Sequence, residues 1–196
     1  MKIELKGVKH HTSLSEETNA FTGSVYIDGK RAATASNRGH GEPVALRPIE
    51  GKQHLLAKAT EFLARQKQVE LGKDMSVPLD LDLLIGHMVA VDLVRSDVKR
   101  RAKNLCGPDA KMAIKFRDTQ EIMVYKVKPH SAVRNAKGPA HEVIVAKEQK
   151  DGHDPVCLNT LYESDPEAAR RELAIAWEVA DLYDWTLEST LATGRL

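Results

Sequence analysis

The most constraining feature of the sequence is a long series of aliphatic residues spaced three or four apart in its middle. The series comprises Leu84, Met88, Val91, Val94, Val98, Ala102 and Leu105. This spacing places all of them on one face of a single helix, which we expect to span residues 79–104 and to bury that face. Gly86 interrupts the helix at a cost of ~1 kcal/mol relative to Ala, so we expect packing to require the missing side chain.

A β-hairpin is the clearest signal before this helix. Residues 21–36, FTGSVYIDGKRAATAS, alternate apolar and polar side chains around Asp28-Gly29. Asp-Gly favours a two-residue turn, because Gly accepts a positive φ without a Cβ clash. Residues 2–10 and 43–49 predict two further strands at the edges of the sheet, the second because it contains two prolines.

The remaining elements follow from the same two periodicities. Apolar residues at helical spacing predict a helix, and alternation predicts a strand. We expect a helix over residues 51–68 and strands over residues 110–118, 120–129 and 141–147, with a basic loop, SAVRNAKGPA, before the last strand.

The last predicted element is a helix over residues 164–186. Ser164 or Asp165 can cap it, and Pro166 suits its first position. One face of this helix is apolar, and the other is acidic through Glu178, Asp181 and Asp184.

These elements predict an α+β protein in two parts. The first part is a β-hairpin sheet with a helix, residues 1–72, and the second is a long helix with a small sheet and a C-terminal helix, residues 79–196. The polar break LGKDMSVP separates them.

Composition restricts the class of protein. The chain has 196 residues, 42% of them hydrophobic and 29% charged, which suits a folded domain and argues against disorder. It has two cysteines, Cys106 and Cys157, which favours a reducing compartment over a disulfide scaffold. No apolar run approaches the ~20 residues of a membrane span, and the N-terminus has no apolar signal core. We therefore expect a cytoplasmic protein without membrane contact.

Charge is unevenly distributed along the chain. Residues 1–94 hold 12 basic and 12 acidic side chains, residues 95–137 hold 12 and 4, and residues 142–188 hold 4 and 12. Two explanations are open: the basic and acidic segments neutralise each other in the fold, or each faces a different partner.

The sequence contains no recognised catalytic or metal-binding signature. It has no HExxH, no paired CxxC and no GxGxxG. The segment DGHDP could offer Asp151, His153 and Asp154 to a cation, but it is more simply a turn. His87 and both cysteines are expected to be buried or boundary residues. We predict no catalytic residue, no metal site and no cofactor.

The loop SNRGHGEP, residues 36–43, is the first candidate binding site. Backbone amides around its glycines could form an anion nest, and Arg38 could grip a phosphate or carboxylate. The alternative is a turn that its glycines permit. A small-ligand binder or enzyme centred on Arg38 and His40 is therefore one hypothesis. The candidate ligand-binding residues are Asn37, Arg38, Gly39, His40 and Gly41.

The basic segment is the second candidate site. Arg95, Lys99 and Lys103 follow one another at a spacing of four on the long helix, so they share a face. Such a surface could neutralise several phosphates, although few aromatic residues are available for base stacking. The alternative is a solvated face that pairs with the acidic last helix. The candidate contacts with a nucleic acid or acidic partner are Arg95, Lys99, Arg100, Lys103, Lys111, Lys115 and Arg134.

The N-terminal pattern resembles a family of small uncharacterised proteins from bacteria, phages and mobile elements. The matching residues are Thr18, Phe21, Tyr26, Asp28, Gly29, Lys30, Asn37, Gly39 and Gly41. The chain departs from that pattern at Arg38, where the family has an acidic residue, and at Gly41-Glu42, where it has Gly-Gly. The resemblance implies a phage or mobile-element accessory protein and no particular activity.

The order of strands and helix around VYIDGK is also similar to the core of double-stranded-RNA-binding domains, without their first helix. We expect a non-catalytic binding protein, in concrete form an accessory or anti-defence factor that docks on a host protein or nucleoprotein complex. The alternative is a direct nucleic-acid binder that uses residues 95–137.

Overall fold

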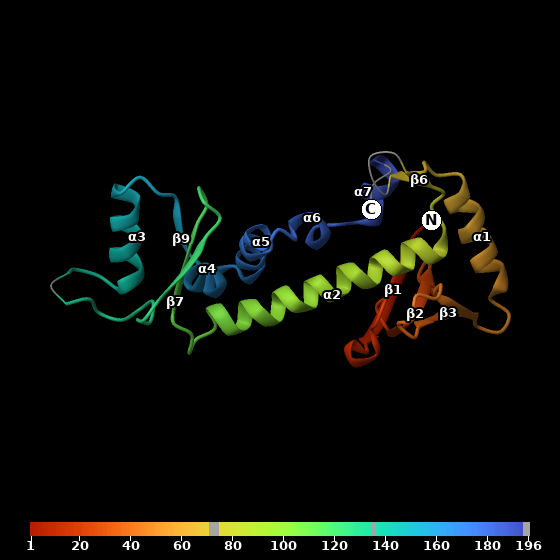
Figure 1. Ribbon diagram of the computed structural model, residues 1–196, viewed down its shortest axis with the longest axis horizontal. Helices are drawn as coiled ribbons and strands as arrows, with labels where there is room; N and C mark the ends of the chain where they lie inside the picture. Colours follow the sequence, from red (N-terminus) through yellow and green to blue (C-terminus); the bar gives the residue numbers. More distant parts are fainter. Residues whose placement is uncertain (71–74, 135, 194–196) are drawn as a thin grey trace. The chain divides into compact units, whose positions relative to one another are not determined.

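The computed structural model describes residues 1–70, 75–134 and 136–193. The chain divides into two compact units: unit 1 is residues 1–93 with 184–196, and unit 2 is residues 94–183. Antiparallel sheets and helices occur in separate stretches of the chain, which confirms the α+β class (Figure 1).

The predicted break after the first part includes residues 71–74, which lie outside the described residues.

Unit 1 contains a four-stranded antiparallel sheet in the order β1-β2-β3-β4. The predicted edge strands do lie at its edges. Its elements are β1 (Ile3–His10), a 3-10 turn (Thr12–Leu14), β2 (Phe21–Ile27), β3 (Lys30–Asn37), β4 (Ala45–Pro48), α1 (Gln53–Ala64), β5 (Val69–Glu70), β6 (Ser76–Val77), the first part of α2 (Leu81–Cys106) and α7 (Leu187–Thr193).

The predicted hairpin is confirmed at its turn. Asp28 and Gly29 both have positive φ, 47° and 76°, as a two-residue turn between twisted strands requires. The alternation then places Val25 and Ile27 of β2 in the core, where they are almost fully buried. Helix α1 packs against β2 and β3, and Leu84 of α2 joins the same core.

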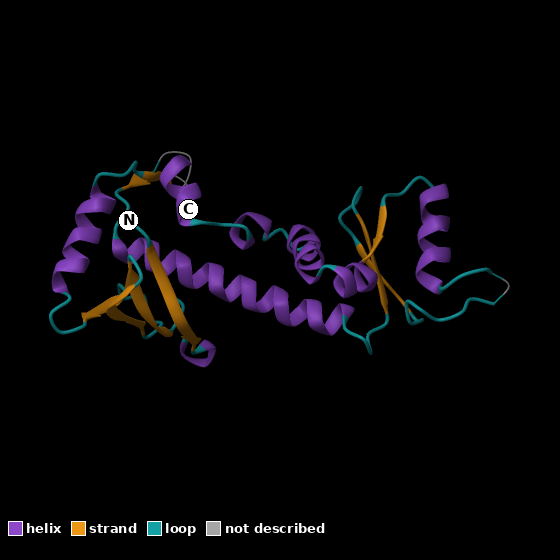
Figure 2. Ribbon diagram, turned by 180° about the vertical axis from the view of Figure 1, so that it is seen from behind, coloured by secondary structure: helices purple, strands orange, loops and turns teal. Residues whose placement is uncertain are grey.

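Unit 2 is built around a three-stranded antiparallel sheet in the order β8-β7-β9. Its strands are among those drawn in orange in Figure 2. Its elements are the second part of α2, β7 (Met112–Phe116), β8 (Ile122–Tyr125), α3 (Ala140–Lys150), β9 (Pro155–Cys157), α4 (Leu158–Ser164), α5 (Pro166–Ala176) and α6 (Ala180–Tyr183).

The central strand β7 is covered on both faces, and all five of its residues are buried. Met112 and Ile114 on one face pack in a cluster with Ile144 of α3. Ala113 on the other face packs with Leu158 of α4 and Leu173 of α5. Lys115 is the one charged residue among these five.

The prediction of a strand at 141–147 is wrong, because these residues belong to α3. Their β-branched run suggests a strand, but the buried positions follow helical spacing. Ala140 is fully buried and Ile144, four residues later, packs in the same cluster. Pro139 precedes the first residue of the helix and supplies an extended N-cap, with ψ 158°.

The predicted single helix at 164–186 is also wrong, because it is interrupted. Asp165 caps its first part, α5, as expected, by accepting hydrogen bonds from two backbone N–H groups. The helix ends at Ala176, and Glu178, two residues later, takes a positive φ of 57°. Val179 N then donates to Ala174 O, and Glu178 N donates to Ile175 O. This is a Schellman ending with Glu where Gly is usual. The predicted acidic face is therefore not one helical surface.

Candidate functional site

The loop at 36–43 is held together by the side chain of Asn37. Its Oδ1 accepts hydrogen bonds from Gly39 N at 2.7 Å and from Thr18 Oγ1 at 3.0 Å. Its Nδ2 donates to the backbone oxygen of Glu42. The amide of Asn37 is thereby engaged in shaping the loop and joining it to the preceding segment.

Gly39 fixes the position of the segment that precedes β2. Its carbonyl accepts hydrogen bonds from the backbone N–H groups of Glu16, Glu17 and Thr18. Its φ is +94°, and a Cβ on Gly39 would lie 2.2 Å from the carbonyl oxygen of Leu14. Only glycine fits this close approach.

The predicted anion nest exists, but the protein fills it with its own carboxylate. Arg38 N donates to Oε1 of Glu42 at 3.0 Å, and His40 N donates to Oε2 at 3.2 Å. Desolvation raises the pKa of Glu42, but hydrogen bonds from the backbone N–H groups of Glu42, Arg38 and His40 outweigh it and leave the pKa below its usual value. An external anion would have to displace a carboxylate that is already in place.

Arg38 and His40 do not converge on a concave surface. Both side chains are exposed, and His40 Nδ1 lies 3.2 Å from Glu16 Oε2. Asn37, Gly41 and Glu42 do line a cavity of about 730 Å³ in unit 1, but Arg38 and His40 do not. The geometry of this loop is that of a turn stabilised by its own side chains.

The second part of α2 has one buried face and one exposed face, and its basic residues lie on the exposed face. Val98 and Ala102 are buried in unit 2, at 2% and 0% exposure. Lys99, Arg100 and Lys103 are exposed. Arg95 is exposed as well, so the predicted row is a solvent-facing surface. Arg95 also donates a hydrogen bond from its Nε to the carbonyl oxygen of Tyr183 at 2.8 Å, within unit 2.

Lys115 does not belong to that surface, which corrects the prediction. It lies on β7, is 1% exposed and donates to the carboxylate and the carbonyl of Glu172. Arg117, two residues later on the chain, pairs with the same carboxylate. The basic and acidic segments therefore do neutralise each other at this point of the fold.

Most of the other predicted contacts have no such partner. Among the described residues, no ion pair is found for Lys99, Lys103, Lys111 or Arg134. Arg100 pairs with Asp97 on the same helix. An exposed pair of this type contributes ~0–1 kcal/mol, so it can be exchanged for another anion.

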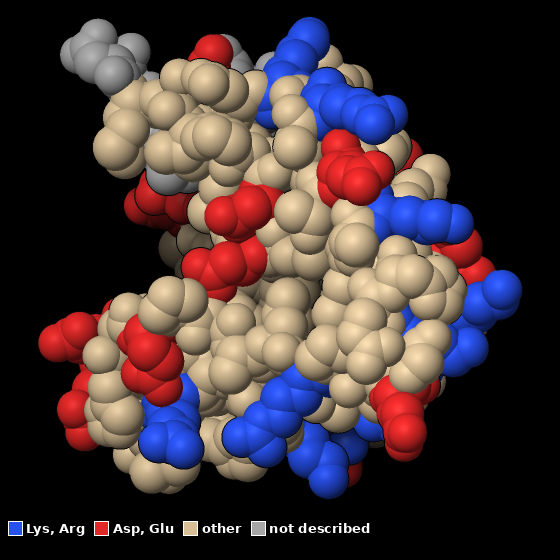
Figure 3. All heavy atoms as spheres, turned by 90° about the vertical axis from the view of Figure 1, so that its right-hand side faces the viewer, with Lys and Arg blue, Asp and Glu red and all other residues tan. Residues whose placement is uncertain are grey.

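Figure 3 shows one face of the molecule in space-filling form. Lys and Arg side chains are interspersed there with Asp and Glu.

No group of three or more metal-ligating side chains occurs within the described ranges. In the turn DGHDP, His153 instead pairs with Asp118, its Nδ1 lying 2.9 Å from Oδ2. Both cysteines are buried and unbridged, and burial raises the pKa of Cys106 to about 12. That thiol is therefore protonated and unreactive at neutral pH.

Sequence reasoning missed the residues that act through distant partners. Glu42 belongs to the loop, but the sequence does not mark it as the occupant of the nest. Glu172 and Asp118 gave no signal, because their partners are 57 and 35 residues away.

Among the described helices, none combines the length and apolar composition needed to cross a bilayer. Neither a protein-family model, nor a curated protein, nor a solved structure matches this chain.

Proposed function

We propose that this protein acts by binding rather than by catalysis, and that unit 2 docks on the phosphate backbone of a nucleic acid, either free or within a host nucleoprotein complex. The observation that carries the proposal is the exposed cationic turn of α2, formed by Lys99, Arg100 and Lys103. The opposite face of this turn is anchored by Val98 and Ala102, so the cations are presented on a supported helix.

Internal neutralisation accounts for only part of the basic segment. It explains Lys115 and Arg117, which share Glu172. Other acidic residues of the same unit have partners elsewhere: Glu163 pairs with His130, and Glu167 pairs with Arg170. Within the cationic turn of α2, Arg100 pairs with Asp97 of the same helix, and Lys99 and Lys103 are left to solvent or to a partner. Charge of this kind accelerates and orients an encounter with a polyanion.

The expected binding mode is contact with phosphates rather than with bases. The basic segment has few aromatic side chains: Phe116 is 5% exposed, and Tyr125 is half-buried beside Glu148. Base stacking therefore has little to use, and affinity should depend on salt and little on sequence.

The N-terminal resemblance supports a phage or mobile-element setting for such a protein. An accessory or anti-defence factor could cover a nucleic-acid surface that a host complex needs.

The test is fluorescence anisotropy with labelled duplex DNA, single-stranded DNA and duplex RNA at low salt. The full chain should bind at least one of them, and the triple variant K99E/R100E/K103E should bind at least about tenfold more weakly.

The matched control is K9E/K30E/K58E. It makes the same charge change at exposed lysines of unit 1 and should bind like the native protein. Absence of binding to all three nucleic acids, or equal losses in the two variants, would contradict the proposal.

A further inference from the structure

Gly86 differs from every other described glycine. Seven of the ten have a positive φ, and in two more, Gly23 and Gly107, a Cβ would lie 3.1 Å or less from a neighbouring atom. Gly86 has neither property: no atom outside its own helical backbone lies within 4 Å of the position of its missing Cβ. The expectation that packing requires this glycine is therefore wrong.

The absence of a side chain at Gly86 weakens the helix without helping the fold. Glycine in a helix interior costs ~1 kcal/mol relative to Ala, and α2 extends five residues before Gly86 and twenty after it. Alanine would fit in the open space. A helix-interior glycine that packing does not require is a candidate for a functional requirement.

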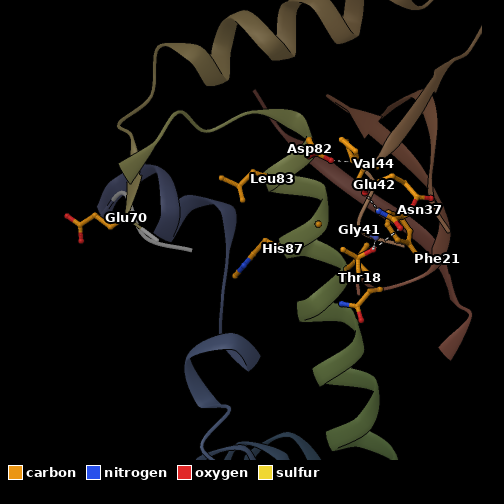
Figure 4. Close-up of a pocket in the computed structure, with 14 residues that line it drawn as sticks. Thr18, Phe21, Asn37, Gly41, Glu42, Val44, Glu70, Asp82, Leu83 and His87 are labelled. Carbon is orange, nitrogen blue, oxygen red and sulfur yellow. Dashed lines mark hydrogen bonds between the residues drawn. The ribbon is translucent and has the colours of Figure 1, made fainter. Parts of the chain in front are cut away.

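The open space beside Gly86 belongs to the cavity of about 730 Å³ in unit 1. Asp82, Gly86 and Val89 supply the α2 side, since positions four and three apart share a helical face. Glu42 and Val44 supply the facing side. Figure 4 shows Asp82 close to Val44, and the carboxylate of Asp82 accepts a hydrogen bond from the backbone N–H of Val44. The same view shows Leu83 and His87 projecting away from the loop.

The lining of this cavity combines apolar surface with negative charge. Phe21, Val44 and Val89 are among its apolar lining residues, and its acidic lining residues are Glu42, Glu70 and Asp82. None of the described lining residues is Lys or Arg. Burial lowers the pKa of His87, so this side chain adds no positive charge at neutral pH. An anionic ligand would meet only like charge here.

We propose that the cavity binds an organic cation, a protonated amine or guanidinium carried on an apolar body, and that Gly86 keeps the space open for it. The carboxylates of Glu42 and Asp82 each retain lone pairs beyond the hydrogen bonds they accept within the protein. The volume lies in the range of ~300–1,000 Å³ typical of small-ligand sites. The cation could belong to a free amine or to the basic side chain of a peptide.

The test uses three matched probes on the full chain: tryptamine, the neutral alcohol tryptophol and the anion indole-3-propionate. A blocked Leu-Arg-Leu peptide represents the peptide source. Binding is followed through the backbone amide signals of Asp82 and Gly86 in ¹H–¹⁵N spectra.

Tryptamine, the peptide or both should shift these signals in a saturable way, and whichever does so identifies the source. Tryptophol should bind at least about tenfold more weakly and indole-3-propionate not at all. No saturable shift with either cation, or an equal response to the anion, would overturn the proposal.

Two variants test the role of the glycine. Gly86→Ala should unfold at the same or a higher temperature than the native protein, and Gly86→Leu should weaken cation binding at least about tenfold. Ala57→Leu, at an exposed position of α1, is the control and should bind normally. A destabilised Gly86→Ala protein, or unchanged binding in Gly86→Leu, would show that the glycine does not hold the cavity open for a ligand.

Discussion

The ammonium group of Lys115 lies 2.8 Å from a carboxylate oxygen of Glu172, with only 1% of the lysine side chain exposed. The same ammonium donates to the carbonyl oxygen of Glu172 at 2.9 Å. Arg117 holds the other carboxylate oxygen. A cation that the sequence groups with a binding surface is thus part of the interior of unit 2.

Breaking this pair from the acidic side should be costly. Glu172→Ala leaves the buried ammonium of Lys115 without its counter-charge, which we expect to lower the free energy of unfolding by ~3 kcal/mol. The double variant Lys115→Met/Glu172→Ala should regain part of that loss, because Met fills the space without a charge. Urea denaturation measures both. A double variant as unstable as Glu172→Ala would show that charge burial is not the cause.

The same pair should respond to acid. Burial raises the pKa of Glu172, but hydrogen bonds from Lys115 and Arg117 outweigh it and leave the pKa below 4.5. A carboxyl with a depressed folded pKa stabilises the protein above its unfolded pKa and ceases to do so as pH falls through the folded pKa. The stability difference between native protein and Glu172→Gln should therefore shrink between about pH 5 and pH 3. A difference that stays constant over this range would contradict the assignment.

His153 should titrate above its usual range. The hydrogen bond that the imidazole of His153 donates to the carboxylate of Asp118 raises the pKa of His153 above 6.5. The stability that the protonated imidazole contributes is fully present below its unfolded pKa. This contribution is lost as the pH rises through the higher pKa of the folded state. An NMR titration of the imidazole should give a midpoint above 6.5, and Asp118→Asn should lower it. Equal midpoints in the two proteins would exclude this ion pair.

The occupied nest makes a prediction about anions. Native protein should show no phosphate-dependent shift at the amides of Arg38 and His40, because Glu42 accepts both hydrogen bonds. Glu42→Ala should expose these donors, and phosphate should then shift their NMR signals. If phosphate shifts them in the native protein, the loop is an anion site and not a self-satisfied turn.

Two glycines with positive φ should differ in their tolerance of a methyl group. Gly51→Ala has open space and should cost only ~1–2 kcal/mol of backbone strain. Gly39→Ala adds a collision with the Leu14 carbonyl and should cost clearly more, with loss of the segment before β2. Thermal unfolding of the two variants measures their losses in stability. Equal losses would mean that the close contact between Gly39 and the Leu14 carbonyl is not formed.

Much of the fold could be predicted because its signals are local. Asp28-Gly29 predicts the hairpin turn, and the apolar stripe through Leu84 and Val98 predicts the long helix α2. The errors lie where tertiary structure overrides a local pattern. The β-branched run Val143–Val145 suggests a strand but packs as a helix after Pro139. Glu178 ends α5 in a conformation that usually belongs to glycine, so nothing in the sequence marks the stop.

The candidate sites were harder to predict for a related reason. The sequence gives the charge of each residue but not its ion-pair partner. Lys115 and Lys99 therefore look alike in the sequence, and only the fold shows that Lys115 lies beside Glu172. The glycines of the loop predict the turn at Gly39, but they do not predict that the carboxylate of Glu42 accepts hydrogen bonds from the backbone of that turn. The space beside Gly86 exists only once the loop around Val44 faces α2.

The salt dependence of nucleic-acid binding tests the central claim most directly. Each phosphate neutralised contributes about −0.9 to the slope of log K against log salt concentration for duplex DNA. Native protein should bind with a steep slope, and K99E/R100E/K103E should bind with a slope shallower by about 2.7. Identical slopes in the two proteins, or no binding by the native protein at low salt, would contradict a phosphate-contacting role for this turn of α2.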